Sequence, residues 1–164
     1  MLKSSDGSPL VVFHGTNFVF DKFEPRRLGL SCNNPSTCFG FFFTESEQDA
    51  WSWAARGSKR VAAPDSPRVI KANLQVKNLL DLSYTKFHFY LQRAKVSTMQ
   101  RHMAEWIAEG FDGFTVVREG HRWYLPFDVS RISIVGTIEA QHIQMADVKA
   151  SAQHQETRRP TMRL

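Results

Sequence analysis

Short apolar runs bounded by turn residues are the main pattern along this chain, and they predict strands. The runs lie at 10–13, 40–44, 68–76, 113–117, 122–128 and 131–138. The clearest is PRVIKANLQV at 67–76, where apolar and polar positions alternate with the period of two that a half-buried strand requires. Arg118 to Arg122 enclose Gly120 and are expected to form a hairpin turn between the fourth and fifth runs. The connections therefore predict mainly antiparallel pairing.

Two further segments space their apolar residues as a helix does. Thr44 or Ser46 can cap the first, and Gly57 is expected to end it. Its buried side is marked by Ala50, Trp51, Ala54 and Ala55. The second segment lies at 97–109, ends at Gly110, and has Met99, Met103, Trp106 and Ile107 at helical spacing. About six strands with one or two helices between them predict an α+β fold, with two facing sheets and a cleft where the first two strands part.

Length and charge limit the classes of protein that fit. The chain has 164 residues, 42% of them hydrophobic, which suffices for one buried core and is too short for two. We expect one domain over 1–140 and a flexible basic tail over 141–164. Much of the net charge of +5 comes from Arg158, Arg159 and Arg163 of that tail. The tail has no aromatic residue and no recognisable reader motif, which disfavours specific nucleic-acid binding.

Metal, disulfide and membrane chemistry find little support in the sequence. Cys32 and Cys38 have no partner ligands beside them, so a zinc site or a disulfide framework is not expected. The N-terminus lacks the continuous apolar region of a Sec signal, and no segment reaches the roughly 18 apolar residues that a membrane span needs. We expect a cytoplasmic protein, or one delivered into a host or target cell by a signal-independent route.

His14 and Gly15 follow directly on the first apolar run, LVVF. A glycine allows a ligand to approach the backbone closely, and a neighbouring imidazole can reach a hydroxyl group. The pair therefore suits a planar amide next to a sugar, as in nicotinamide riboside. The alternative is a core histidine bonded to the backbone.

Four blocks of this sequence resemble the diphtheria-toxin and poly(ADP-ribose) polymerase-like ADP-ribosyltransferases, especially the small bacterial and phage-borne domains. The blocks are DGSPLVVFHGTNFVFDKF, GFFFTESEQDAWSWA, GFDGFTVV and WYLPFDVSRISIV, and they run in the family's order from about residue 6 to 136. The resemblance implies a fold of split antiparallel β-sheets with a few flanking helices. It also implies NAD as the substrate and a His-Tyr-Glu triad on three strands.

The resemblance assigns a role to each matching residue. His14 matches the triad histidine that binds the adenosine-side ribose, Gly15 the residue whose backbone holds the nicotinamide amide, and Thr16 the small hydroxyl residue that follows. Phe42 stands at the triad tyrosine, so the aromatic face is kept and the hydroxyl is lost. Trp53, eleven residues on, matches the aromatic that sandwiches the nicotinamide. Aromatic faces attract a cationic ring, although Phe42 and Trp53 would serve equally well as core residues.

The third block departs from the family pattern of Glu-Tyr-(Val/Ile)-Val-(Phe/Tyr)-Asp. The triad glutamate falls on Trp123, so the carboxylate that would stabilise an oxocarbenium-like ribose is missing there. Glu119, four residues upstream, is a candidate surrogate, although turn glutamates are usually only solvated. Asp128 matches an aspartate beyond the triad and is expected to be structural. Arg26, Arg27 and Arg56 are candidates for the pyrophosphate, or plain surface residues.

Three hypotheses follow. The first is an NAD-dependent mono-ADP-ribosyltransferase of toxin or effector type, with His14, Phe42, Trp123 and Glu119 as its candidate catalytic residues. The second is a module of the same fold that binds NAD, ADP-ribose or a protein without chemistry. The third takes the chain as a piece of a larger polypeptide. The acceptor of the transferase stays open among protein, nucleic acid and small molecule, with a protein preferred to a nucleic acid.

Overall fold

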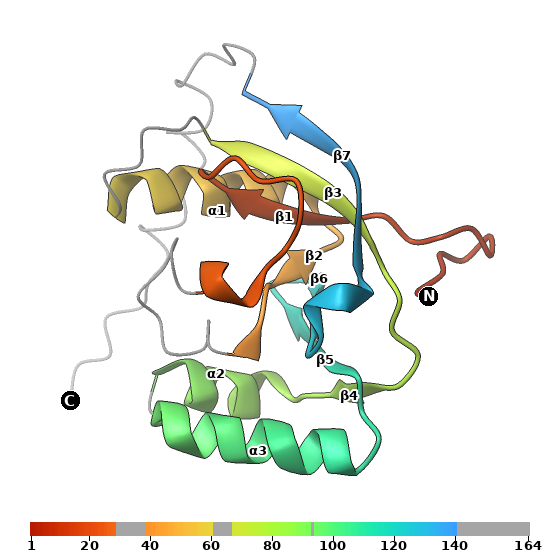
Figure 1. Ribbon diagram of the computed structural model, residues 1–164, viewed down its shortest axis with the longest axis vertical. Helices are drawn as coiled ribbons and strands as arrows, with labels where there is room; N and C mark the ends of the chain where they lie inside the picture. Colours follow the sequence, from red (N-terminus) through yellow and green to blue (C-terminus); the bar gives the residue numbers. More distant parts are fainter. Residues whose placement is uncertain (29–38, 61–66, 93, 141–164) are drawn as a thin grey trace.

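The computed structural model describes residues 1–28, 39–60, 67–92 and 94–140. These residues form seven strands and three α-helices (Figure 1). The strands are β1 (Val12–Thr16), β2 (Phe43–Thr44), β3 (Arg68–Leu74), β4 (Leu79–Asp81), β5 (Gly113–Arg118), β6 (His121–Pro126) and β7 (Ile132–Glu139). The helices are α1 (Glu47–Arg60), α2 (Tyr84–Gln92) and α3 (Val96–Ala108), with the short 3-10 helices η1 (Pro25–Arg27) and η3 (Val129–Arg131).

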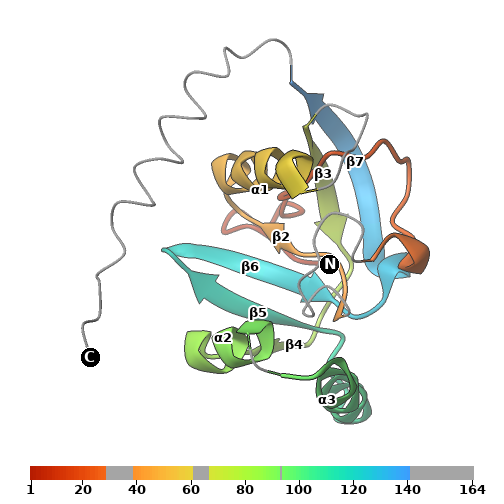
Figure 2. The ribbon, with the colours of Figure 1, turned by 90° about the vertical axis from the view of Figure 1, so that its left-hand side faces the viewer.

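All strands belong to one sheet with the order β4-β5-β6-β2-β1-β3-β7. Only β4 and β5 run parallel, and every other pair is antiparallel, which confirms the α+β prediction. The two-residue strand β2 joins the β4-β5-β6 part of the sheet to the β1-β3-β7 part. Its Thr44 pairs with Phe13 of β1 and with Trp123 of β6. Around this short junction the β5–β6 hairpin and the β3–β7 pair run in clearly different directions (Figure 2). The prediction of two facing sheets with a cleft between the first two strands is therefore wrong, because the described strands form one hydrogen-bonded sheet in which β1 and β2 pair directly.

The two faces of the sheet carry separate hydrophobic clusters. The first cluster contains Val12, Phe23, Phe41, Phe43, Ile70, Ala72, Leu74, Val76 and Tyr124. The second contains Phe39, Leu82, Phe87, Met99, Phe114, Val116, Trp123 and Leu125. Neighbouring residues of β6 alternate between the two, with Tyr124 in the first and Trp123 in the second, as strand geometry requires. The face of each side chain thus decides which cluster it joins.

Helix α1 lies directly on β1 because Gly15 leaves room for it. A Cβ atom added at Gly15 would overlap the Ala50 carbonyl oxygen of α1 and lie 2.8 Å from the Ala54 nitrogen. Ala50 and Ala54 are buried at this contact, and their small side chains allow the close approach. Ser46 caps the helix, its hydroxyl accepting a 3.2 Å hydrogen bond from the Asp49 amide.

Several elements differ from the sequence-based expectation. Strand β1 continues through His14, Gly15 and Thr16, where the pattern placed its end. Helix α1 runs past Gly57 to Arg60, because one glycine costs a helix only about 1 kcal/mol. Strand β4 is not among the strands that the sequence predicts. Its three residues are too few for an alternating pattern to appear, and it is held by parallel pairing with β5.

Some expectations lie outside the described residues, namely Cys32, Cys38 and the tail over 141–164. Within the described ranges, no three His, Cys, Asp or Glu side chains gather in a way that could hold a metal ion. No helix in those ranges is long and apolar enough to span a membrane.

Candidate functional site

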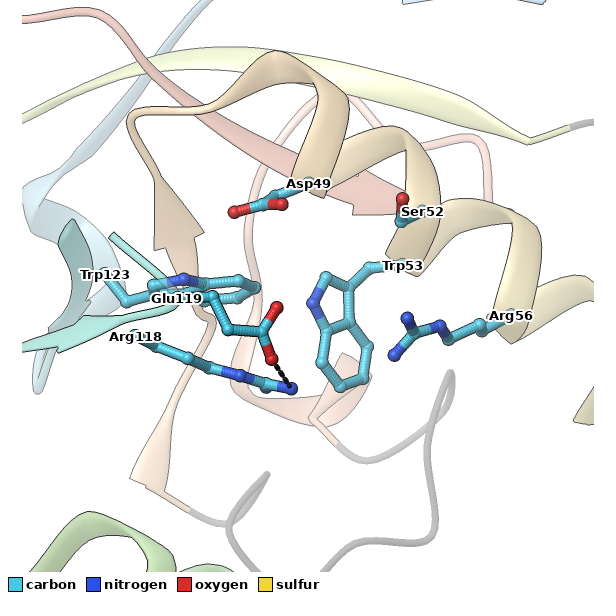
Figure 3. A pocket seen from close by; sticks show the side chains of 7 residues that line it. All are labelled: Asp49, Ser52, Trp53, Arg56, Arg118, Glu119 and Trp123. Atoms are coloured by element: carbon cyan, nitrogen blue, oxygen red, sulfur yellow. Dashed lines mark hydrogen bonds and ion pairs between the residues drawn. The ribbon is translucent and has the colours of Figure 1, made fainter. Parts of the chain in front are cut away.

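A hollow lies between helix α1 and the β5–β6 hairpin (Figure 3). It is lined by Asp49, Ser52, Trp53 and Arg56 of α1, and by Arg118, Glu119 and Trp123 of the hairpin. The four residues of α1 are spaced by three and four, so the helical period brings them to one face. The strand pairing sets Trp123 on the face of the sheet opposite to Tyr124.

Two tryptophan rings and two guanidinium groups form one side of this hollow. The rings of Trp53 and Trp123 meet edge to face, with their centroids 5.9 Å apart. The Arg118 guanidinium carbon lies 5.5 Å from the Trp53 centroid and 5.7 Å from the Trp123 centroid. Arg56 lies 5.2 Å from the Trp53 centroid. The aromatic faces of the hollow are therefore suited to planar cations.

Two carboxylates complete the hollow. Glu119 forms a 3.4 Å ion pair with Arg118. It occupies the left-handed backbone region with φ 52° and precedes Gly120 with φ 85°, the pattern of a two-residue hairpin turn. For a residue other than glycine, this conformation costs about 1 kcal/mol. Burial raises the pKa of Asp49, the nearby charge of Glu119 raises it further, and His121, Arg118 and Arg56 oppose the rise.

Two N–H groups of the hollow lack an acceptor among the described residues. They are Nε1 of Trp123 and Nε of Arg118, and both atoms are buried. A buried donor without a partner costs about 1–3 kcal/mol. Because both atoms are covered, a ligand oxygen can accept from them only after neighbouring side chains move.

The hollow contains three of the seven residues proposed as catalytic or NAD-binding, together with Arg56, one of the three arginines proposed for the pyrophosphate. Trp53, Trp123 and Glu119 line it, whereas His14 and Phe42 do not. The His14 ring lies among aromatic residues of the first cluster, with its centroid 5.5 Å from that of Phe43. Phe42 packs on the second cluster, beside Phe87 and Phe114. His14 and Phe42 therefore face opposite sides of the sheet, although the His14 ring bonds to the Phe42 backbone.

The sequence profile of a family described as ADP-ribosyltransferase in polyvalent proteins matches residues 4–140. The chain belongs to this ADP-ribosyltransferase family. Its matched region includes every strand and helix described above. No curated protein sequence matches the chain.

The ADP-ribosyltransferase domain is also similar to a solved structure, that of the M. tuberculosis MbcT–MbcA toxin–antitoxin complex. The TM-score is 0.56, and the similarity covers 87% of this chain and 90% of the matched chain. At 11% sequence identity, the likeness concerns the fold. The family match therefore assigns the domain to the ADP-ribosyltransferases, and the similar solved structure supports its α+β fold.

His14 of the ADP-ribosyltransferase domain is held as a neutral imidazole. The Phe42 carbonyl oxygen can only accept, so Nδ1 of His14 donates in the 2.8 Å bond between them. Nε2 then carries the lone pair and can accept from a hydroxyl group. Burial lowers the pKa of His14 to about 4, and the bond to Phe42 offsets only part of that effect.

The lowered pKa predicts a pH-dependent loss of stability in the ADP-ribosyltransferase domain. Because the folded pKa lies below the unfolded one, His14 contributes stability above about pH 6.5 that is lost as the pH falls toward 4. Between pH 7 and pH 5, the free energy of unfolding of the parent should therefore fall by about 1–2 kcal/mol more than that of His14→Gln. Urea unfolding of both proteins at the two pH values measures this. Parallel curves for the two proteins would contradict it.

The remaining predicted residues make local contacts. Thr16 is buried, and its hydroxyl accepts a 3.2 Å hydrogen bond from the Phe18 amide. Arg26 and Arg27 pair with Glu24 at 2.8 and 3.6 Å. Asp128 accepts from the Ser130 amide at 2.8 Å and caps η3, which is a structural role.

Sequence reasoning missed three residues that line the hollow and one pair on the other face of the sheet. Asp49 and Ser52 share the helical spacing of Trp53, and Arg118 directly precedes Glu119, so proximity along the chain could have indicated all three. In the pair on the other face, the Tyr124 hydroxyl donates to the Glu45 carboxylate. Burial and the bond to Glu45 raise the pKa of Tyr124. No sequence pattern indicates this last pair, because 79 positions separate its members.

Proposed function

We propose that this domain cleaves the nicotinamide glycosidic bond of NAD and transfers the ADP-ribose to a macromolecular acceptor, as a mono-ADP-ribosyltransferase of toxin or effector type. The observation that carries the proposal is the meeting of two indole rings with two carboxylates in one hollow. Trp53 and Trp123 supply faces for the positively charged nicotinamide ring. Glu119 and Asp49 supply negative charge beside it.

The chemistry of the bond supports the use of Glu119. Breaking the bond to nicotinamide develops positive charge on the ribose, and a fixed carboxylate nearby lowers the energy of that transition state. Nicotinamide leaves as a neutral molecule, so the site needs no general acid. Glu119 lies across the hollow from α1 and next to Trp123, the residue that the resemblance sets at the family's glutamate position. It can therefore replace the missing carboxylate.

The charges around the hollow also suit a dinucleotide. Arg56 and Arg118 can pair with the two phosphates once the nicotinamide ring lies on the indoles. His14 packs against the first cluster on the other face of the sheet, so a dinucleotide placed in this hollow does not use it. Among the possible acceptors we prefer a protein to a nucleic acid.

The proposed function is tested with NAD labelled in its adenylate group. The purified protein is incubated with this NAD and a bacterial lysate, and the products are separated on a denaturing gel. We expect label on one or a few bands that protease removes and nuclease leaves. Release of nicotinamide without any labelled macromolecule would contradict transfer, and intact NAD after long incubation would contradict the enzymatic function.

A second function is favoured by Trp123 itself. This residue is 7% exposed and fills the place that the resemblance gives to the triad glutamate. A domain in which a tryptophan replaces the catalytic carboxylate would bind NAD or ADP-ribose without consuming it. Calorimetric binding of NAD that stays intact would favour this binding module over the enzyme.

A further inference from the structure

The Arg118 guanidinium takes an unusual position, because it lies over both indole rings of the hollow at once (Figure 3). The Arg56 guanidinium lies over the Trp53 ring, 5.2 Å from its centroid. A guanidinium group is a planar cation, and so is the nicotinamide ring of NAD. The corner formed by Trp53 and Trp123 therefore already holds a group with the shape and charge of the proposed ligand.

The contacts that hold Arg118 there are weak enough to be exchanged. Its ion pair with Glu119 spans 3.4 Å, and the Glu119 side chain is 57% exposed. Exposed pairs of this kind contribute little. The Nε–H group of Arg118 is buried without a hydrogen-bond acceptor among the described residues, which further disfavours this position. A competing planar cation would thus displace a group that is poorly anchored.

A second observation points to the kind of ligand. Nε1 of Trp123 is a buried donor without an acceptor among the residues described, on a side chain more than nine-tenths buried. A ligand with an oxygen beside its ring would satisfy this donor. Nicotinamide has such an oxygen in its carboxamide, and a guanidinium has none.

We propose that Arg118 occupies the place of the nicotinamide ring and must leave the indole corner before NAD can bind. Arg118 is then a residue that limits access to the site. On leaving, its guanidinium is free to pair with a phosphate of the dinucleotide. This inference rests on the proposed function, because it names what controls the same hollow.

The experiment measures binding of N-methylnicotinamide by calorimetry. This compound, methylated on the ring nitrogen, is a planar cation without phosphates. Arg118→Gln should bind it about fivefold or more tighter than the parent protein, since the competing guanidinium is gone. Neutral nicotinamide should also bind more tightly to Arg118→Gln, because the guanidinium no longer occupies the space over the two indole rings. Arg101→Gln, on the exposed face of α3, removes the same charge elsewhere and should leave both affinities unchanged.

Three outcomes would overturn the inference. Equal affinity of parent and Arg118→Gln for N-methylnicotinamide would show that Arg118 does not occupy the ring site. A gain for the cation without a gain for neutral nicotinamide would reduce the effect to charge repulsion. Absence of binding to both proteins would show that the corner is no ring site. In each case NAD turnover, measured separately, decides the proposed function independently.

A second variant tests the role of the indole nitrogen. Trp123→Phe keeps an aromatic ring and removes the N–H group. In the Arg118→Gln background, N-methylnicotinamide should bind better than N-methylpyridinium, which lacks the carboxamide. Adding Trp123→Phe should abolish most of that preference, and an unchanged preference would contradict a bond from Trp123 to the ligand.

Discussion

Replacing Gly15 by alanine is expected to destabilise the domain by about 3 kcal/mol or more. The added Cβ would overlap the Ala50 carbonyl oxygen and lie 2.8 Å from the Ala54 nitrogen, so it meets backbone of α1 and no side chain that could turn away. Overpacking of a core costs about 1–3 kcal/mol when side chains can adjust, and here the whole helix must shift. Urea unfolding at pH 7 measures the loss.

The matched control for this change is Gly136→Ala on strand β7. A Cβ added there would meet only the Lys71 Cε atom at 3.4 Å, the far end of a flexible side chain. This variant should change the free energy of unfolding by less than about 1 kcal/mol. Similar losses in both variants would show that α1 does not rest on Gly15 as closely as the structure indicates.

Glu119→Gln is expected to lower the rate of NAD cleavage by about a hundredfold, with little change in NAD binding. Loss of one preorganised electrostatic group in a site commonly costs about 3 kcal/mol in the transition state. Glutamine keeps the length and shape of the side chain, so the left-handed backbone at this turn is not relieved. Release of nicotinamide, followed by chromatography, gives kcat and KM.

The control here is Glu109→Gln, which removes one exposed carboxylate at the end of α3, away from the hollow. Its turnover should equal that of the parent. If Glu119→Gln cleaves NAD as fast as the parent, Glu119 is not the catalytic carboxylate. Asp49 is then the next candidate in the same hollow.

Most of the strand segments and the α+β class could be predicted from the sequence because both depend on local patterns. Alternation at 67–76 marks β3, and the turn around Gly120 marks the β5–β6 hairpin. Strand β4 escaped prediction, because three residues carry no readable period and its parallel partner lies more than thirty positions away. The continuation of α1 past Gly57 likewise depends on the helix around it.

The candidate site was predictable only in part. The ordered blocks of sequence pointed to Trp53 and Trp123, and Glu119 was proposed as a carboxylate four residues upstream of Trp123. These three residues line one hollow. Arg118 was not predicted, although it is the group that lies over both indole rings. Its position depends on the approach of α1 to the hairpin, and that approach connects segments more than sixty residues apart.

The sequence by itself determined the family, the order of elements and the residue types available for chemistry. The tertiary structure alone decided which side of the sheet each residue faces. His14 on β1 and Phe42, directly before β2, share a hydrogen bond, yet their rings join different clusters. The physical reason is that a strand has a period of two, so a difference of one position in register reverses the face, and register is fixed by pairing between distant strands.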